Sequence, residues 1–160
     1  MIYIDLDGVL ADFNGKVLEI MGKYPSEISR KELWKTLEQV DNFYYSLDII
    51  NGSKEHLEYI WNNSFVNVEI LTALPSPSKK LRTSANDKIM WVNDNLTPFI
   101  TTNCVSNWRM KSGFCRSNSD VLVDDQEKNI VMWTEAGGIG ILHSNFDDTI
   151  RKLKEINAVR

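Results

Sequence analysis

With 160 residues, 42% of them hydrophobic and 25% charged, the chain has the size and composition of one globular domain that buries its own core. Its net charge of −4 offers no general attraction to nucleic acid or anionic membranes, and its two cysteines are too few for a disulfide framework. No apolar run approaches the ~20 residues of a membrane span and no signal sequence precedes the first strand, so we expect a cytoplasmic protein with no membrane and no stable nucleic-acid partner.

The first element is an apolar run over residues 1–4, which predicts a short buried strand. Asp5 and Asp7 follow it, and residues two apart lean to the same side of an extended chain. Two carboxylates placed in this way repel each other unless a cation or a shared proton intervenes. Gly8 then allows the chain to turn or to approach a ligand closely. By themselves, these residues fit an acidic turn as well as a chemical site.

The next part of the chain, residues 13–64, contains predicted helices and no convincing strand. Apolar spacing predicts a helix over 12–22, a capping box predicts a second over 30–39, and a third is expected over 53–62. Residues 41–52, between the second and third helices, are dense in aromatic side chains. We interpret residues 13–64 as a helical insertion that forms a small cap.

The rest of the chain alternates between strands and helices. The pattern predicts strands at 66–72, 99–102, 120–125 and 139–142, helices at 87–96, 127–136 and 146–157, and a polar loop or frayed helix start at 76–86. Such alternation is typical of a parallel sheet covered on both faces, with ligands at the carboxyl ends of its strands. We therefore expect one α/β domain over 1–160, with its core at about 1–12 and 65–160.

Polar side chains follow three of the predicted strands at that edge. They are Asp5 and Asp7 after the first, Thr72 at the end of the second, and Asp124 with Asp125 after a later one. Lys111 lies 13 positions before Asp124. Acids, a hydroxyl and a lysine that converge from separate strands indicate a functional site.

Four motifs in this order resemble those of the haloacid dehalogenase superfamily of phosphotransferases. They are Asp5-Leu-Asp-Gly-Val, Thr72, Lys111 and Val123-Asp124-Asp125, and the resemblance covers nearly the whole chain. It implies a three-layer, Rossmann-like parallel sheet with a small helical cap inserted after the first strand. The stretches at 5–13, 42–44, 71–73, 88–92 and 122–125 also resemble the 5'(3')-deoxyribonucleotidase branch of that superfamily.

The resemblance implies specific roles for the acids. Asp5 would be the nucleophile that forms an aspartyl-phosphate, and Asp7 would protonate the leaving group and then deprotonate water. Mg²⁺ would be held by Asp5, Asp124 and the backbone carbonyl of Asp7, because it prefers oxygen ligands and bridges to phosphate. Asp125 would support this group.

A second set of residues would bind the substrate. Thr72, Ala73 and Lys111 would hold the phosphate, with Arg109 and Arg116 left open as alternatives to Lys111. Aromatic residues of the predicted cap favour a nucleotide, because nucleobases stack on aromatic faces. The candidates for contact with the substrate are Phe13, Phe43, Tyr44 and Lys88, and Trp34 and Tyr45 lie in the same aromatic group. Each of these also fits ordinary packing or a solvated surface, while Trp108, Trp133, His56 and His143 are expected to be structural.

We therefore expect a Mg²⁺-dependent enzyme, a monomer or homodimer, that hydrolyses (deoxy)ribonucleoside monophosphates. One alternative is a phosphatase of the same fold for another phosphomonoester, such as a nucleic-acid 3'-phosphate end or a small metabolite. The other is a catalytically silent binding module, against which the intact Asp5, Asp7, Thr72 and Asp124 argue. The preferences for base, for 5' or 3' phosphate and for deoxyribose or ribose are left open.

Overall fold

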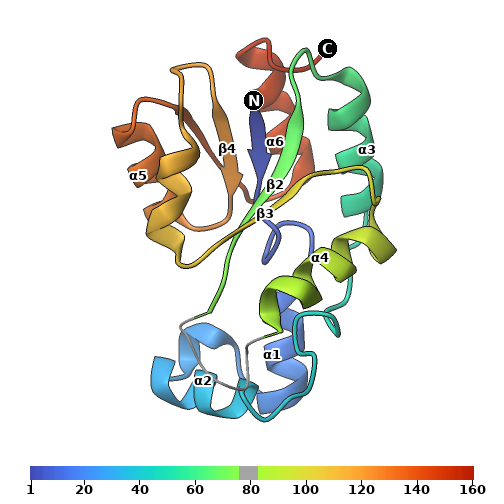
Figure 1. Cartoon of the computed structure of the whole chain (residues 1–160), viewed down its shortest axis with the longest axis vertical. Helices are drawn as coiled ribbons and strands as arrows, with labels where there is room; N and C mark the ends of the chain where they lie inside the picture. Colours follow the sequence, from blue (N-terminus) through green and yellow to red (C-terminus); the bar gives the residue numbers. More distant parts are fainter. Residues whose placement is uncertain (76–82) are drawn as a thin grey trace.

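A parallel sheet forms the centre of the molecule (Figure 1). The computed structural model describes residues 1–75 and 83–160, and within them the strands are β1 (Ile2–Ile4), β2 (Val68–Ala73), β3 (Thr102–Val105), β4 (Val121–Asp124) and β5 (Ile139–Leu142). Their order is β3-β2-β1-β4-β5, and every neighbouring pair is parallel. The strand that comes first in the sequence therefore lies in the middle of the sheet.

The register of the three central strands decides what meets at the carboxyl edge. Ile4 of β1 lies beside Ile70 of β2 and Val123 of β4. Asp5 and Asp124 come one residue after two of these partners, so they reach the edge at the same level. Thr72 follows Ile70 by two residues on the other side of β1. The parallel register alone thus brings these polar side chains together.

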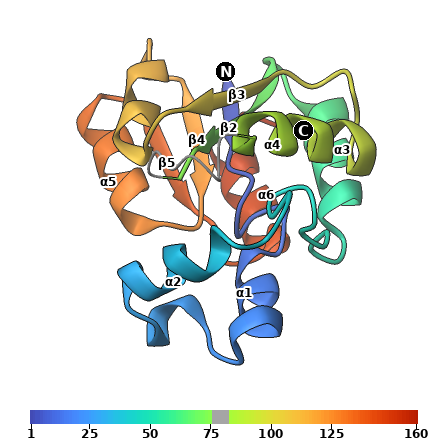
Figure 2. The same ribbon diagram turned by 60° about the horizontal axis from the view of Figure 1, so that its bottom comes forward.

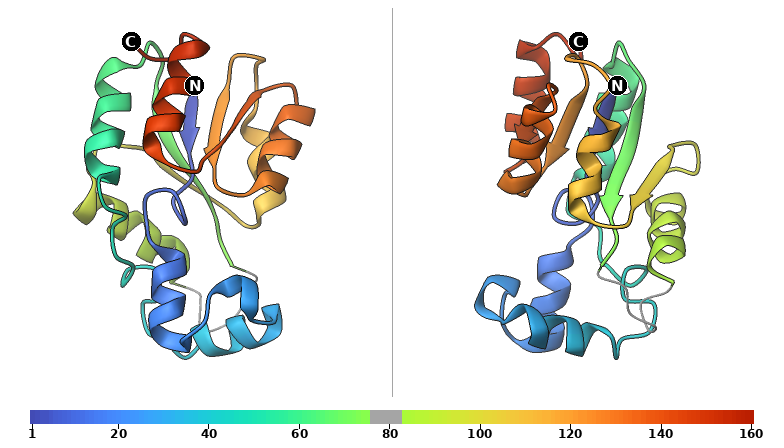
Figure 3. Two further views of the ribbon diagram at one scale, coloured as in Figure 1. Left: turned by 180° about the vertical axis from the view of Figure 1, so that it is seen from behind. Right: turned by 60° about the vertical axis from the view of Figure 1, so that its left-hand side comes forward.

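Alternation along the central strands builds a core on each face of the sheet. Ile2, Ile4 and Ile70 belong to the larger core, which also contains residues of α3 (Ser53–Asn63), α4 (Ser84–Asn95) and α6 (Phe146–Glu155). Tyr3 and Leu122 point to the other face, where they pack with Trp133 of α5 (Glu127–Glu135) and the 3₁₀ helix η2 (Trp108–Phe114). Figure 3 shows the two helical layers on either side of the strands. The predicted three-layer α/β fold is confirmed.

The segment between β1 and β2 leaves the sheet at its carboxyl edge. It contains α1 (Phe13–Met21), the 3₁₀ helix η1 (Pro25–Glu27) and α2 (Arg30–Leu37), which project beyond the strand ends, and then α3 (Figure 2). α3 instead packs beside α6 against the sheet, with Leu57 and Ile60 in the larger core. The division of the chain into a core and a cap at 13–64 stays a prediction, and α1 and α2 are the helices placed to cover the edge.

The predicted elements lie within three residues of their observed ends, but the strand predicted at 99–102 overlaps the observed strand at Thr102 alone. The strand β3 begins at Thr102 and runs to Val105. The apolar pair Phe99-Ile100 suggested a strand, yet Phe99 is 84% exposed and only Ile100 is buried. β3 is an edge strand, so it needs a less apolar sequence, and its Asn103 bonds to Glu69 of β2.

Two further points concern the helices. The sequence pattern did not predict η2, which carries Lys111. Of the predicted polar loop at 76–86, residues 76–82 lie outside the described residues, and residues 84–86 form the first turn of α4. Within the described part of the chain, no helix combines the length and apolar character needed to cross a membrane.

Candidate active site

The chain makes a tight turn after β1, and Gly8 lies in this turn. The backbone N–H groups of Leu10 and Ala11 donate to the carbonyl of Leu6, which closes a tight loop directly after Asp5. Gly8 has a φ of +81°, and a Cβ at this position would lie 2.5 Å from Oδ2 of Asp125. Glycine is therefore required both by the backbone conformation and by the approach of Asp125.

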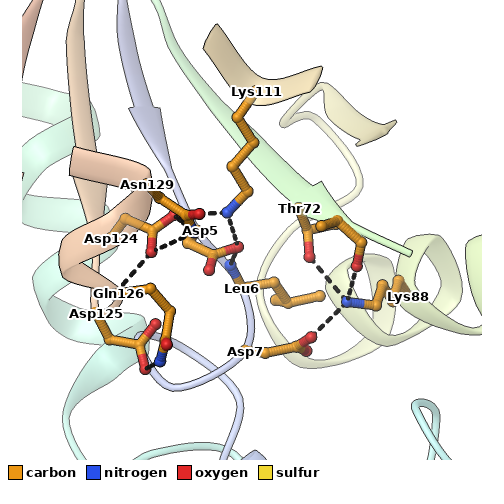
Figure 4. Close-up of polar contacts among 11 residues, drawn as sticks. Asp5, Leu6, Asp7, Thr72, Lys88, Lys111, Asp124, Asp125, Gln126 and Asn129 are labelled. Carbon is orange, nitrogen blue, oxygen red and sulfur yellow. Dashed lines mark hydrogen bonds and ion pairs between the residues drawn. The ribbon is translucent and has the colours of Figure 1, made fainter. Parts of the chain in front are cut away.

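Asp5 belongs to a buried cluster around Lys111 (Figure 4). The Lys111 ammonium lies 2.8 Å from Oδ1 of Asp5 and 2.6 Å from Oδ2 of Asp124. Burial alone would lower the pKa of Lys111, but the charges of Asp5 and Asp124 outweigh it and raise the pKa above its usual value. Lys111 therefore stays charged and separates two carboxylates that would otherwise repel each other.

Asp124 is the most enclosed member of this cluster. Its carboxylate is 0% exposed and accepts hydrogen bonds from the backbone N–H of Gln126 and the side-chain amide of Asn129, each at 2.9 Å. Burial, with the charge of Asp5, raises its pKa to about 7 against the opposing effect of Lys111. Burial and Asp5 also raise the pKa of Asp125 to about 6. One ammonium thus leaves the three acids incompletely neutralised.

These three acids can hold a metal ion. One carboxylate oxygen each from Asp5, Asp124 and Asp125 lies within 4.8 Å of the others. Oδ1 of Asp125 is buried and has no hydrogen-bond partner among the described residues. A buried acceptor without a partner is costly. A cation bound by oxygen ligands would satisfy it and balance the excess negative charge, so the residues present fit such an ion.

Asp7 belongs to a second cluster around Lys88 (Figure 4). The Lys88 ammonium, which is fully buried, donates to Oδ2 of Asp7 at 2.5 Å, to the Thr72 hydroxyl at 2.8 Å and to the Ala73 carbonyl at 3.0 Å. It also lies 4.3 Å from the centre of the Tyr44 ring. This one side chain therefore links the loop after β1, the end of β2 and the aromatic segment before α3.

The protonation of Asp7 follows from this position. Burial raises the pKa of Asp7 above its usual value and the charge of Asp5 adds to the effect, while the ammonium of Lys88 opposes it. Oδ1 of Asp7 is buried without a hydrogen-bond partner among the described residues. A protonated carboxyl group at this atom could donate to a group bound beside it.

A cavity of about 720 Å³ opens above the two clusters, within the range of about 300–1,000 Å³ found for small-molecule sites. Asp5, Asp7 and Lys111 line its floor on the sheet side. Phe13, Trp34 and Tyr44, from the helical segment after β1, line another part of its wall. The cavity therefore places a carboxylate–lysine floor opposite aromatic side chains.

Not all predicted substrate-binding residues line this cavity. Phe13, Tyr44 and Ala73 line it, whereas Phe43, Lys88 and Thr72 are fully buried behind its surface. Phe43 packs edge-on against the rings of Phe13 and Tyr44. Lys88 and Thr72 bond to each other within the second cluster. Their proposed contacts with a substrate stay predictions.

The three cations considered as ligands of the phosphate lie in different positions. Lys111 lies between the carboxylates, Arg109 lines the cavity and is exposed, and Arg116 lies beside Asp120 outside the cavity lining. The choice of Lys111 as the phosphate-binding cation stays a prediction. Trp133 is buried as expected, but Trp108 is half-buried and lines the cavity.

Sequence reasoning missed Asn129, whose amide contacts both oxygens of Asp124. The available signal was a polar residue on the inward face of a helix that directly follows the Asp124-Asp125 pair. The pattern did not show that a tertiary contact would satisfy it.

The fold and the carboxyl-edge acids define the class. A haloacid dehalogenase (HAD) family hydrolase from Deinococcus radiodurans R1, solved with bound phosphate and sodium, is similar at TM-score 0.62 and 13% identity, over 99% of this chain and 96% of that one. A HAD-superfamily hydrolase from Ehrlichia chaffeensis is similar at 0.56 and 16%, over 98% and 96%. A hydrolase from Streptococcus pneumoniae TIGR4 is similar at 0.54 and 16%, over 96% and 97%. The fold is thus that of HAD hydrolases.

The sequence narrows the class further. The model of the family described as "5' nucleotidase, deoxy (Pyrimidine), cytosolic type C protein" matches residues 23–151. The chain belongs to this family of 5'-nucleotidases, which confirms the resemblance carried by its motifs. None of the curated proteins matches the chain.

Proposed function

We propose that this protein is a Mg²⁺-dependent phosphomonoesterase that hydrolyses (deoxy)ribonucleoside monophosphates through an aspartyl-phosphate. The observation that carries the proposal is the separation of Asp5 and Asp7 into two lysine clusters at the floor of one cavity. In this arrangement Lys111 orients the carboxylate of Asp5 for attack, while burial raises the pKa of Asp7 as proton transfer requires. The family match supports a nucleotide substrate.

In the first step, an oxygen of Asp5 attacks phosphorus while the bond from phosphorus to the ester oxygen breaks. Oδ1 of Asp5 is held by the backbone N–H of Leu6 at 2.8 Å and by Lys111 at the same distance. These contacts orient the carboxylate for attack. Asp7, whose pKa burial raises, supplies its proton to the leaving alkoxide.

In the second step, water attacks the phosphorus of the aspartyl-phosphate. Asp7, now a carboxylate, takes the proton of that water. The bond between phosphorus and the Asp5 oxygen breaks, which restores the Asp5 carboxylate and releases inorganic phosphate. One acid thus serves as proton donor and then as acceptor.

Asp5, Asp124 and the backbone carbonyl of Asp7 would hold Mg²⁺, supported by Asp125. When bound, the ion supplies positive charge that offsets the negative charge of the phosphoryl oxygens. Asp124 and Asp125 remain aligned in this role because Asn129 and Gln126 donate hydrogen bonds to them.

Thr72, Ala73 and Lys111 would hold the phosphate oxygens by hydrogen bonds and by charge. Residues 13–64 would act as the cap, with Phe13 and Tyr44 against the nucleobase and Phe43 in support behind them. Lys88 would orient Asp7 and Thr72. We expect the enzyme to act in the cytoplasm as a monomer or homodimer, in line with the word "cytosolic" in the family description.

Asp5→Asn tests the proposal by phosphate release from dTMP and dUMP. We expect kcat to fall by at least about 10⁴-fold, because the amide is a poor nucleophile and Lys111 loses a charged partner. EDTA should abolish the wild-type activity, and added Mg²⁺ should restore it.

Asp41→Asn is the matched control, because it makes the same chemical change at an exposed acid outside the cavity lining. It should retain wild-type turnover. Substantial activity in Asp5→Asn would exclude Asp5 as the nucleophile.

A further inference from the structure

Three cations that the proposed chemistry does not use also line the active-site cavity. They are Arg30 at the start of α2, Arg109 in η2 and Lys128 in the first turn of α5. All three are exposed, and none has a carboxylate within 4.0 Å among the described residues. By contrast, Arg151 and Lys152 on α6 both pair with Asp148. The cations at the cavity are therefore available to a bound anion.

Trp108 brings two of these charges together. The guanidinium carbon of Arg109 lies 4.6 Å from the Trp108 ring, and the Lys128 ammonium lies 5.1 Å from it. The two charges are therefore separated by less than the Debye length of about 10 Å at 0.1 M salt, and they repel each other. Contact with the ring orients both cations, and an anion beside them would offset their repulsion. We call Trp108, Arg109 and Lys128 the Trp108 cluster.

The Trp108 cluster is distinct from the groups expected to hold the reacting phosphate. Lys111 is fixed between Asp5 and Asp124 in the cavity floor, and Lys88 is buried with Asp7. Arg109 and Lys128 instead contact a half-buried tryptophan in the wall of the same cavity. A ligand that fills this cavity thus meets positive charge at two places.

A phosphate group suits the chemistry of this second place. Guanidinium binds two phosphate oxygens at once, and ammonium adds a point charge. An indole ring flanked by cations is also a common surface for nucleotides, which offer a base face together with phosphate. Arg30, on α2 beyond the carboxyl edge (Figure 2), adds a third positive charge to the cavity.

We propose that the Trp108 cluster binds a second phosphate group of the substrate, one that is not hydrolysed while it is bound there. The preferred substrates then carry either phosphates at both the 3' and 5' positions of one nucleoside or a phosphodiester next to the terminal phosphate. This inference rests on the proposed function, because it assigns the substrate class of the same cavity.

The test compares thymidine 5'-monophosphate, thymidine 3',5'-bisphosphate and the 5'-phosphorylated dinucleotide of thymidine. For the wild type, we expect kcat/KM to be at least about tenfold higher for a substrate with the second phosphate, the size of one charge-assisted hydrogen bond. The preference should shrink as salt is raised. If both the bisphosphate and the dinucleotide are preferred, the Trp108 cluster accepts a second phosphate of either kind. If one of them is preferred, that substrate shows whether the second phosphate is a monoester or a phosphodiester.

The variant Arg109→Gln/Lys128→Gln should bring this ratio close to one. The control Lys23→Gln/Lys31→Gln removes the same charge from exposed lysines outside the cavity lining and should leave the ratio unchanged. A wild-type ratio near one would overturn the proposal. So would a ratio that survives in Arg109→Gln/Lys128→Gln.

Binding to Asp5→Asn, measured by titration calorimetry with thymidine 3',5'-bisphosphate, separates this inference from the proposed function. Adding Arg109→Gln/Lys128→Gln to Asp5→Asn should weaken that binding by about tenfold or more. This expectation holds whether or not any monophosphate is hydrolysed. Equal binding with and without the charges would overturn the inference. Absence of turnover of every phosphomonoester by the wild type would instead reject the proposed function.

Discussion

One buried lysine, Lys111, lines the floor of the cavity and another, Lys88, lies behind its surface, and the two differ in the charge of their surroundings. Lys111 contacts the carboxylates of Asp5 and Asp124, so its cluster carries excess negative charge. Lys88 contacts one carboxyl group, that of Asp7, and otherwise only neutral groups, so its cluster carries no excess negative charge. A cation is therefore attracted to the first cluster, while the second has no electrostatic need for one.

The comparison shows how acids two residues apart acquire different properties. Asp5 follows the central strand directly and meets the other strand ends of the core. Asp7 lies beyond it in the turn, where α4 and the aromatic segment enclose it. Position relative to the sheet edge, rather than any difference between the two side chains, therefore gives the two acids different neighbours.

The largest effect after loss of the nucleophile is expected for Asp7→Asn. The amide cannot donate and then accept the catalytic proton, so kcat should fall by about 10²–10⁴-fold. Mg²⁺ affinity, measured by titration calorimetry, should stay near the wild-type value because the side chain of Asp7 lies in the cluster around Lys88, away from the three acids. A large loss of Mg²⁺ affinity would show that the two clusters are not separate.

Replacing each lysine by methionine should distinguish the clusters by how the stability of each variant responds to Mg²⁺. In metal-free protein, both Lys88→Met and Lys111→Met should lower the free energy of unfolding by about 3 kcal/mol or more, because each removes a buried ammonium from the polar groups that it contacts. Urea unfolding with and without Mg²⁺ measures the difference.

Added Mg²⁺ should reduce the deficit of Lys111→Met relative to the wild type, because the ion replaces the missing positive charge. It should leave the deficit of Lys88→Met unchanged. Equal recovery of both variants would contradict the assignment of the ion to the first cluster.

A smaller effect is expected for Asp125→Asn, which removes one charge from the first cluster. Outer members of metal sites contribute about 10–100-fold to metal affinity, and Oδ1 of Asp125 is buried without a partner among the described residues. Calorimetric titration with Mg²⁺ should show a loss in this range. The control Asp41→Asn should bind Mg²⁺ like the wild type. Wild-type Mg²⁺ affinity in Asp125→Asn would instead show that Asp125 serves only the turn at Gly8.

The smallest effect is expected for His143, which lies outside both clusters. This residue contributes to the pH dependence of the free energy of unfolding. Burial lowers the pKa of His143 below its ordinary 6.5, assisted by Lys152 and His56 and opposed by Asp148. The folded protein then binds fewer protons than the unfolded chain below pH 6.5. Stability contributed by His143 is therefore complete above 6.5 and declines as pH falls toward the folded pKa.

His143→Gln should remove this part of the decline, as measured by thermal unfolding between pH 5 and about pH 7.5. Because the substitution lies outside both lysine clusters, the response of stability to Mg²⁺ should not change. An unaltered pH dependence in His143→Gln would assign the decline to other groups.

Much of this protein is readable in its sequence. Short apolar strands that end in polar residues predicted the sheet, its carboxyl edge and the meeting of Asp5, Thr72 and Asp124. These features depend on strand alternation and parallel register, both of which are local patterns or follow from them. The strand predicted at 99–102 was displaced by three residues because β3 is an edge strand, where burial imposes little pattern on the sequence.

The tertiary structure decided which lysine serves which acid. Lys88 and Lys111 lie far from Asp5 and Asp7 in the chain, and a lysine on a helix looks the same whether it is solvated or buried. Only packing showed that Lys88 is fully buried against Asp7 and that Asn129 holds Asp124. The sequence thus determined the sheet edge at which the polar side chains meet. Long-range contacts, which produce no periodic pattern in the sequence, determined which charges surround each acid.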